Sequence, residues 1–105
     1  MITIVDYNMG NLGSIANMIN KVGYDSEVSS DLSIISSASK LILPGVGHFD
    51  QAMKNLKNLG LLELIKKKVL IDKVPILGIC LGMQLMCNKS EEGKSEGLGL
   101  VNAEV

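Results

Sequence analysis

Two glycines flank a cysteine at the spacing that hydrolases use around a catalytic nucleophile. The segment Gly78-Ile79-Cys80-Leu81-Gly82 ends an apolar run from Val74 to Ile79, which predicts a buried strand. The apolar positions of the helix that should follow are Leu81, Leu85 and Met86. In a strand-turn-helix elbow the strained turn lifts the nucleophile out of the sheet, and glycines allow close backbone approach. A helix N-terminus beside the sulfur also favours thiolate. The pattern predicts a cysteine nucleophile; the alternative is a small buried cysteine in a core strand.

A second glycine-rich segment, Pro44-Gly45-Val46-Gly47, follows another apolar strand. Glycines on both sides of Val46 allow its peptide N–H to turn outward. Together with the N–H of Leu81, it could form an oxyanion hole for acyl transfer. The alternative is an ordinary β-turn, because Pro-Gly is a common turn dipeptide. His48, the single histidine, is the residue type that usually serves as base to a cysteine, but the favoured interpretation is that it only starts the next helix.

The elements that must position these segments alternate between strand and helix. Strands are predicted over residues 2–5, 27–28, 41–43 and 74–79, and helices over residues 12–22, 32–36, 49–56 and 61–69. This order predicts an α/β, flavodoxin-like parallel sheet with helices on both faces. The loops after three strands, at residues 6–11, 44–48 and 80, then meet at one edge of the sheet, where ligands bind in such folds. A further strand near residue 100 suggests that the sheet is truncated.

Composition limits the remaining possibilities. The 105 residues are 47% apolar and 20% charged, which suffices for one small domain over residues 1–105. A net charge of -1 gives no electrostatic basis for nucleic-acid binding, and no apolar run is long enough to span a membrane. Cys80 and Cys87 match no metal-ligand spacing. Because the N-terminal residues resemble a first strand and not a secretory signal, the reduced cytoplasm is the expected compartment. The charge run at residues 66–68 is interpreted as a solvated face, and Cys87 as core.

Taken together, the motifs resemble those of the class I glutamine amidotransferases. The resemblance is carried by Leu43-Pro-Gly-Val-Gly-His-Phe49 and Gly78-Ile-Cys-Leu-Gly-Met-Gln-Leu-Met86. Within that family, the segments at residues 6–14, 90–93 and 97–99 are most similar to glutaminase subunits that serve imidazole glycerol phosphate synthase in histidine biosynthesis. The resemblance implies that residues 1–105 correspond to the N-terminal part of one amidotransferase domain.

The resemblance implies a role for each matching residue. Cys80 would attack the glutamine side-chain amide to give a thioester and ammonia, with Val46 and Leu81 as backbone oxyanion donors. The positions that would hold or face glutamine are Gly45, Gly47, Gln84 and Glu92. Asn11 would face the partner, a cyclase subunit of the (β/α)₈-barrel type that receives the ammonia. The family uses no metal and no organic cofactor in this step.

The sequence departs from the family in one respect. The base histidine of these enzymes and the glutamate two residues after it lie in the second half of the domain, and neither has a counterpart in residues 1–105. We therefore expect a continuation past Val105 and no glutamine turnover by the 105 residues alone. Two alternatives remain: a glutaminase subunit for sugar amidation in surface-polysaccharide synthesis, and a non-catalytic flavodoxin-like binding domain with an inert cysteine.

Overall fold

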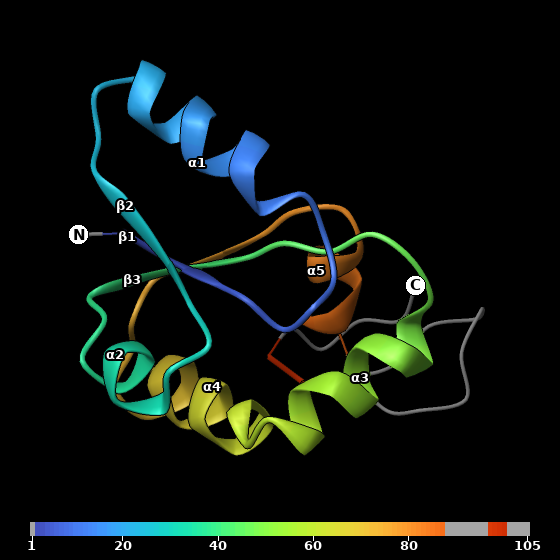
Figure 1. Ribbon diagram of the computed structural model, residues 1–105. Helices are drawn as coiled ribbons and strands as arrows, with labels where there is room; N and C mark the ends of the chain where they lie inside the picture. Colours follow the sequence, from blue (N-terminus) through green and yellow to red (C-terminus); the bar gives the residue numbers. More distant parts are fainter. Residues whose placement is uncertain (1, 88–96, 101–105) are drawn as a thin grey trace.

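The computed structural model describes residues 2–87 and 97–100, and its strands form one parallel sheet (Figure 1). Along the chain the elements are β1 (Ile2–Val5), α1 (Leu12–Lys21), β2 (Ser26–Ser29), α2 (Leu32–Ser36), β3 (Lys40–Leu43), α3 (Phe49–Asn58), α4 (Leu61–Leu70), β4 (Ile76–Gly78) and α5 (Leu81–Leu85). The strand order is β2-β1-β3-β4, with every neighbouring pair parallel. The predicted α/β class, element order and parallel sheet are confirmed.

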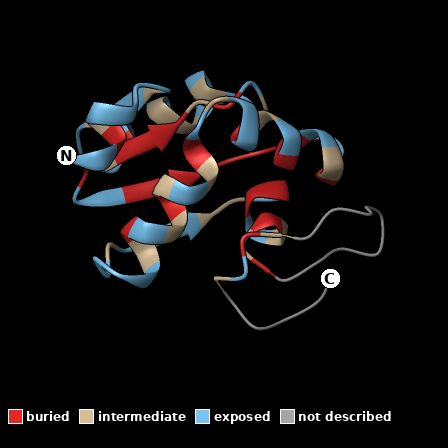
Figure 2. Cartoon of the chain, turned by 90° about the horizontal axis from the view of Figure 1, so that it is seen from below, coloured by how far each residue is buried: buried red, intermediate tan, exposed pale blue. Residues whose placement is uncertain are grey.

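Helices cover both faces of the sheet, as predicted. Because successive strand residues point to opposite faces, β1 and β3 each supply one apolar set to each side. On one face Ile4 and Ile42, which are paired in register, pack with Ile19 of α1. On the other face the core contains Val5 and Leu43 together with buried residues of α2, α3, α4 and α5. Figure 2 shows buried segments in part of the sheet and on the adjoining helices; within the sheet they belong to β1 and β3.

Three of the helices begin at a side-chain cap. Asn11, Asp31 and His48 each accept a hydrogen bond from a backbone N–H in the first turn of α1, α2 and α3, at 3.3, 2.8 and 3.1 Å. These caps satisfy N–H groups that have no partner within the helix. Hydrogen bonds from the side chain and amide of Ser33 lower the pKa of Asp31. The interpretation of His48 as the residue that starts a helix is confirmed.

The fourth strand is shorter and more exposed than predicted. β4 spans Ile76–Gly78 instead of residues 74–79, and Leu77 is 58% exposed. The physical reason is its place at the edge: β4 pairs with β3 on one side and with no other strand that the structure describes. The apolar run therefore predicted the existence of the strand correctly, but the expectation that the strand is buried is wrong.

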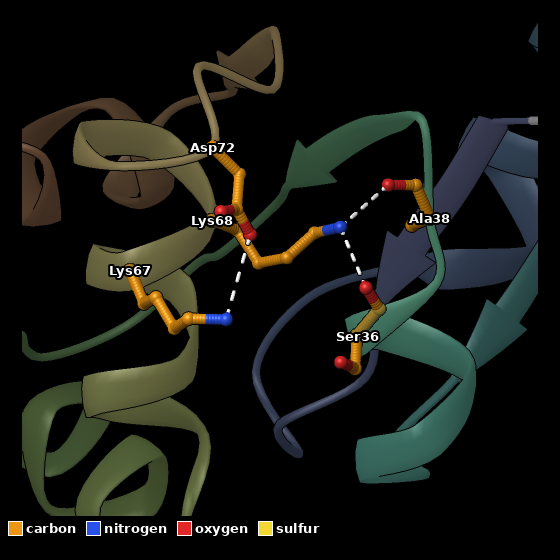
Figure 3. A network of polar contacts seen from close by, with 5 residues as sticks. All are labelled: Ser36, Ala38, Lys67, Lys68 and Asp72. Atoms are coloured by element: carbon orange, nitrogen blue, oxygen red, sulfur yellow. Dashed lines mark hydrogen bonds and ion pairs between the residues drawn. The ribbon is translucent and has the colours of Figure 1, made fainter.

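Lys68 corrects a second expectation, that the whole charge run of residues 66–68 is a solvated face. The residue is only 5% exposed, and its Nζ donates to the carbonyl oxygens of Ser36 at 2.7 Å and Ala38 at 2.8 Å (Figure 3). Those carbonyls lie at the C-terminal end of α2, where the helix leaves C=O groups without partners and where a cation is favourable. Lys67, its neighbour, is the exposed lysine and lies 3.7 Å from Asp72.

Candidate functional site

Cys80 occupies the strained turn between β4 and α5. Its backbone has φ 54° and ψ -118°, a conformation that costs an L-residue free energy and recurs at functional sites. The residue is exposed, whereas Cys87 is buried, so the thiol of Cys80 is the accessible one. Cys87 is confirmed as part of the core. The predicted elbow geometry is present in the structure.

The two glycines of the elbow are required by close backbone contacts. A Cβ on Gly78 would lie 2.7 Å from the α-carbon of Met83, and a Cβ on Gly82 would collide with the carbonyl oxygen of Leu43. The amide of Ile79 donates to that same carbonyl at 3.0 Å. The start of α5 is therefore pressed against the end of β3, which places Cys80 beside the loop that follows β3.

That loop, residues 44–47, is hereafter called the glycine loop. The amide of Leu81 donates a 3.0 Å hydrogen bond to the carbonyl oxygen of Gly45, so the glycine loop and the elbow are in direct contact. Val46 is 59% exposed, and its N–H makes no hydrogen bond to any residue in ranges 2–87 and 97–100. Gly47 has φ 116°, which favours glycine. The two amides predicted as oxyanion donors therefore differ. The amide of Leu81 already donates a hydrogen bond within the protein, whereas that of Val46 has no acceptor among the described residues.

The loop after β1 packs against the glycine loop. A Cβ on Gly10 would lie 3.3 Å from the amide nitrogen of Gly45, and one on Gly47 would lie 3.0 Å from the terminal methyl of Met9. The hydroxyl of Tyr7 donates a hydrogen bond to the carbonyl oxygen of Pro44. The three loops that were predicted to meet at the carboxyl edge of the sheet do meet there.

The remaining predicted site residues are placed as follows. Gln84 lies on α5, where its Oε1 is buried without a hydrogen-bond partner among the described residues. Asn11 follows directly on the loop after β1, and its side chain caps α1. Glu92 lies outside the described residues. His48 turns its Nδ1 toward its own helix α3. The roles of these residues toward glutamine or a partner remain predictions.

Tyr7 is the residue that sequence reasoning missed. It is fully buried, and burial raises the pKa of its hydroxyl well above the ordinary value. One signal was available: Tyr7 is one of only three aromatic residues in the chain and directly follows the first strand. A tyrosine in a polar loop at the carboxyl edge of a parallel sheet is typical of a residue whose hydroxyl makes a structural hydrogen bond.

Residues 2–87 and 97–100 contain no cluster of three or more histidine, cysteine, aspartate or glutamate side chains that could hold a metal ion. No helix in this part of the chain is long and apolar enough to cross a membrane.

Comparison with known proteins gives one consistent family. The model of the class-I glutamine amidotransferases matches residues 3–97. An imidazole glycerol phosphate synthase subunit HisH 2 of Methanococcus maripaludis is 59% identical over 98% of this chain and 51% of its own length. A HisH 1 subunit of the same synthase from Campylobacter jejuni is 49% identical over 100% of this chain and 53% of its own.

A solved structure agrees on the fold. A crystal structure of a glutamine amidotransferase superposes with a TM-score of 0.81 at 18% identity and covers 99% of this chain and 55% of that one. The chain thus spans about half the length of the relatives that it matches. With the family model matched along nearly all of its residues, the chain belongs to the class I glutamine amidotransferases.

Proposed function

We propose that these residues are the cysteine-bearing half of a glutaminase that hydrolyses glutamine to glutamate and ammonia in the cytoplasm. The observation that carries the proposal is the exposed Cys80, held at φ 54° in an elbow that contacts the glycine loop. Its Sγ attacks the side-chain carbonyl carbon of glutamine and forms a tetrahedral oxyanion. The amide nitrogen takes up the proton that the thiol has lost and leaves as ammonia, and the γ-glutamyl thioester remains. Water then attacks the thioester, which releases glutamate and returns a proton to the thiol.

The oxyanion needs donors, and one of them must first be released. Because the amide of Leu81 donates to Gly45, it cannot at the same time donate to an oxyanion. Rotation of the peptide between Gly45 and Val46 would move the Gly45 carbonyl away and turn the free N–H of Val46 toward the site. Both predicted donors would then face the reacting carbon, so we infer that the arrangement with Leu81 bonded to Gly45 is the resting one.

Substrate recognition and proton transfer draw on further groups. We assign Gly45, Gly47, Gln84 and Glu92 to the binding of glutamine. The buried Oε1 of Gln84 has no donor in residues 2–87 and 97–100, which supports its part, because a buried acceptor without a donor is costly. The single histidine caps α3, so it is not available as the base. We infer that a histidine with a carboxylate partner comes from the part of the relatives' length that this chain does not span.

The acceptor of the ammonia is proposed from the relatives. Both relatives are named as subunits of imidazole glycerol phosphate synthase. This favours use of the ammonia by that synthase over its use in sugar amidation. We propose that the surface at Asn11 faces a cyclase subunit of (β/α)₈-barrel type. In that complex the ammonia passes to the ribonucleotide without release.

The experiment is a chimera in which the 105 residues are followed by the second half of the Methanococcus maripaludis relative. The chimera, combined with that organism's cyclase subunit, should release glutamate from glutamine. Cys80→Ser should lower turnover by at least ~10³-fold, whereas the matched Cys87→Ser should retain it. Turnover that persists in Cys80→Ser, or a chimera that folds but leaves glutamine intact, would contradict the proposal.

A further inference from the structure

Resting on the proposed glutaminase function, we propose that Tyr7 is a positioning residue whose hydroxyl holds the Pro44 carbonyl and thereby confines movement of the glycine loop to the Gly45–Val46 peptide. Tyr7 does not touch the reacting atoms in this arrangement. It acts through the loop that carries the oxyanion donor.

Tyr7 is held at both of its ends. Its hydroxyl donates to the carbonyl oxygen of Pro44, and its own backbone carbonyl accepts a 3.0 Å hydrogen bond from Nδ2 of Asn55 on α3. The side chain is completely buried in the larger core. Because burial keeps the phenol protonated, it remains a donor throughout the physiological pH range.

The position of this hydrogen bond divides the loop into a fixed and a movable part. The carbonyl of Leu43 accepts from Ile79, and the carbonyl of Pro44 accepts from Tyr7, so the chain is fixed up to that point. Among the described residues, the next carbonyl, that of Gly45, accepts a hydrogen bond only from the amide of Leu81, the group that the proposed reaction must release. Without the Tyr7 hydroxyl the rotation would no longer pivot about a fixed peptide, and the donors would lose their alignment.

Tyr7 and Gly45 are also sterically matched. A Cβ on Gly45 would collide with the Tyr7 hydroxyl oxygen, whereas its next contacts, the amide nitrogen of Gly82 and the Cβ of Leu81, lie at 3.2 Å. The tyrosine hydroxyl is therefore the nearest obstacle to a side chain at position 45. Removing the hydroxyl oxygen would remove the worst of these contacts.

The kinetic test uses Tyr7→Phe in the chimera described above. Misplaced oxyanion donors act on the transition state more than on substrate binding, so kcat should fall by ~10- to 100-fold while KM changes less than about 2-fold. Tyr24→Phe is the matched control, because Tyr24 is 60% exposed. Asn55→Ala, which releases Tyr7 from the other end, should give the same split at smaller size. An unchanged kcat in Tyr7→Phe would overturn the proposal.

A second measurement does not depend on turnover. In the 105-residue chain, Tyr7→Phe should raise the hydrogen-exchange rate of the Leu81 amide at least ~10-fold relative to Tyr24→Phe, because its acceptor peptide is less firmly held. Gly45→Ala should lower the melting temperature less in the Tyr7→Phe background than in the parent. Unchanged exchange at Leu81 would refute the positioning role. A chimera without turnover would refute the glutaminase instead, and the exchange result would still decide the role of Tyr7.

Discussion

Gly82 lies against Leu43 with no space between them for a side chain: a Cβ on the glycine would collide with the carbonyl oxygen of the leucine. Since both partners in this contact are backbone, neither can move aside as a flexible side chain could. The entry of the chain into α5, and with it the position of Cys80, depends on this contact.

Gly82→Ala should therefore lower the free energy of unfolding by ~3 kcal/mol, through forced displacement of α5 from β3. The matched control is Gly13→Ala on α1, where a Cβ would meet nothing within 4 Å. That variant should gain about 0.5–1 kcal/mol, because alanine is the better helix residue. Urea unfolding followed by circular dichroism measures both. Equal effects at the two positions would show that the contact is not as close as described.

Lys68→Met should lower the unfolding free energy by about 2–3 kcal/mol. Methionine keeps much of the buried stem but leaves the carbonyls of Ser36 and Ala38 without their donor. Lys67→Met is the control, because that side chain is 60% exposed and its ion pair with Asp72 should contribute less than about 1 kcal/mol. Denaturant unfolding of the two variants side by side distinguishes a structural lysine from a surface one; a smaller loss in Lys68→Met than in Lys67→Met would contradict this assignment.

Stability at alkaline pH should depend on Tyr7. Burial raises the pKa of the folded-state phenol, whereas in the unfolded chain it is about 10. Below pH ~10 both states hold the proton; above it only the unfolded state loses it, so the unfolding free energy falls by up to about 1.4 kcal/mol per pH unit. Thermal melts from pH 9 to 11.5 should show this slope in the parent and in Tyr24→Phe, and a shallower one in Tyr7→Phe. Parallel curves for all three proteins would count against the burial of this hydroxyl.

The two cysteines should differ sharply toward alkylating reagents. Cys80 is exposed on the elbow, whereas Cys87 is buried with its Sγ 3.7 Å from the carbonyl oxygen of Met83. Iodoacetamide added to the folded chain should modify Cys80 first, at least ~10-fold faster, and peptide mass spectrometry locates the label. The difference should vanish in denaturant. Equal labelling rates for the two cysteines of the folded protein would show that the thiol of Cys80 is not accessible at the elbow.

Local sequence patterns predicted most of the fold because each reports a local physical requirement. The apolar run of residues 41–43 and the 3.6-residue spacing of Phe49, Ala52 and Leu56 correspond to β3 and α3. Gly78, ahead of Cys80, corresponds to a close contact with the backbone of Met83 in the helix that follows. Such features are visible along the chain because neighbours in sequence carry them.

What could not be predicted depends on residues far apart in sequence. Lys68 reads as a surface charge until its Nζ is seen to reach carbonyls some thirty positions earlier. Leu81 reads as a free donor until Gly45 is found to accept from it. The sequence places Tyr7 in a loop, as the structure does, but does not indicate that its hydroxyl donates to the carbonyl oxygen of Pro44. Each of these contacts arises from tertiary packing, which periodicity and spacing do not encode.

The backbone of Cys80 sets fold stability and reactivity against each other. At φ 54° and ψ -118° glycine is the residue that suffers least, so Cys80→Gly should raise the melting temperature by a few degrees even though it abolishes the thiol. Cys80→Ser, with its Cβ retained, should not gain. If thermal melts show this, then replacing the nucleophile by glycine stabilises the fold. Only selection for the chemistry of the thiol would then keep cysteine at this position. A lineage released from that selection would be expected to drift toward glycine here before its fold decayed elsewhere.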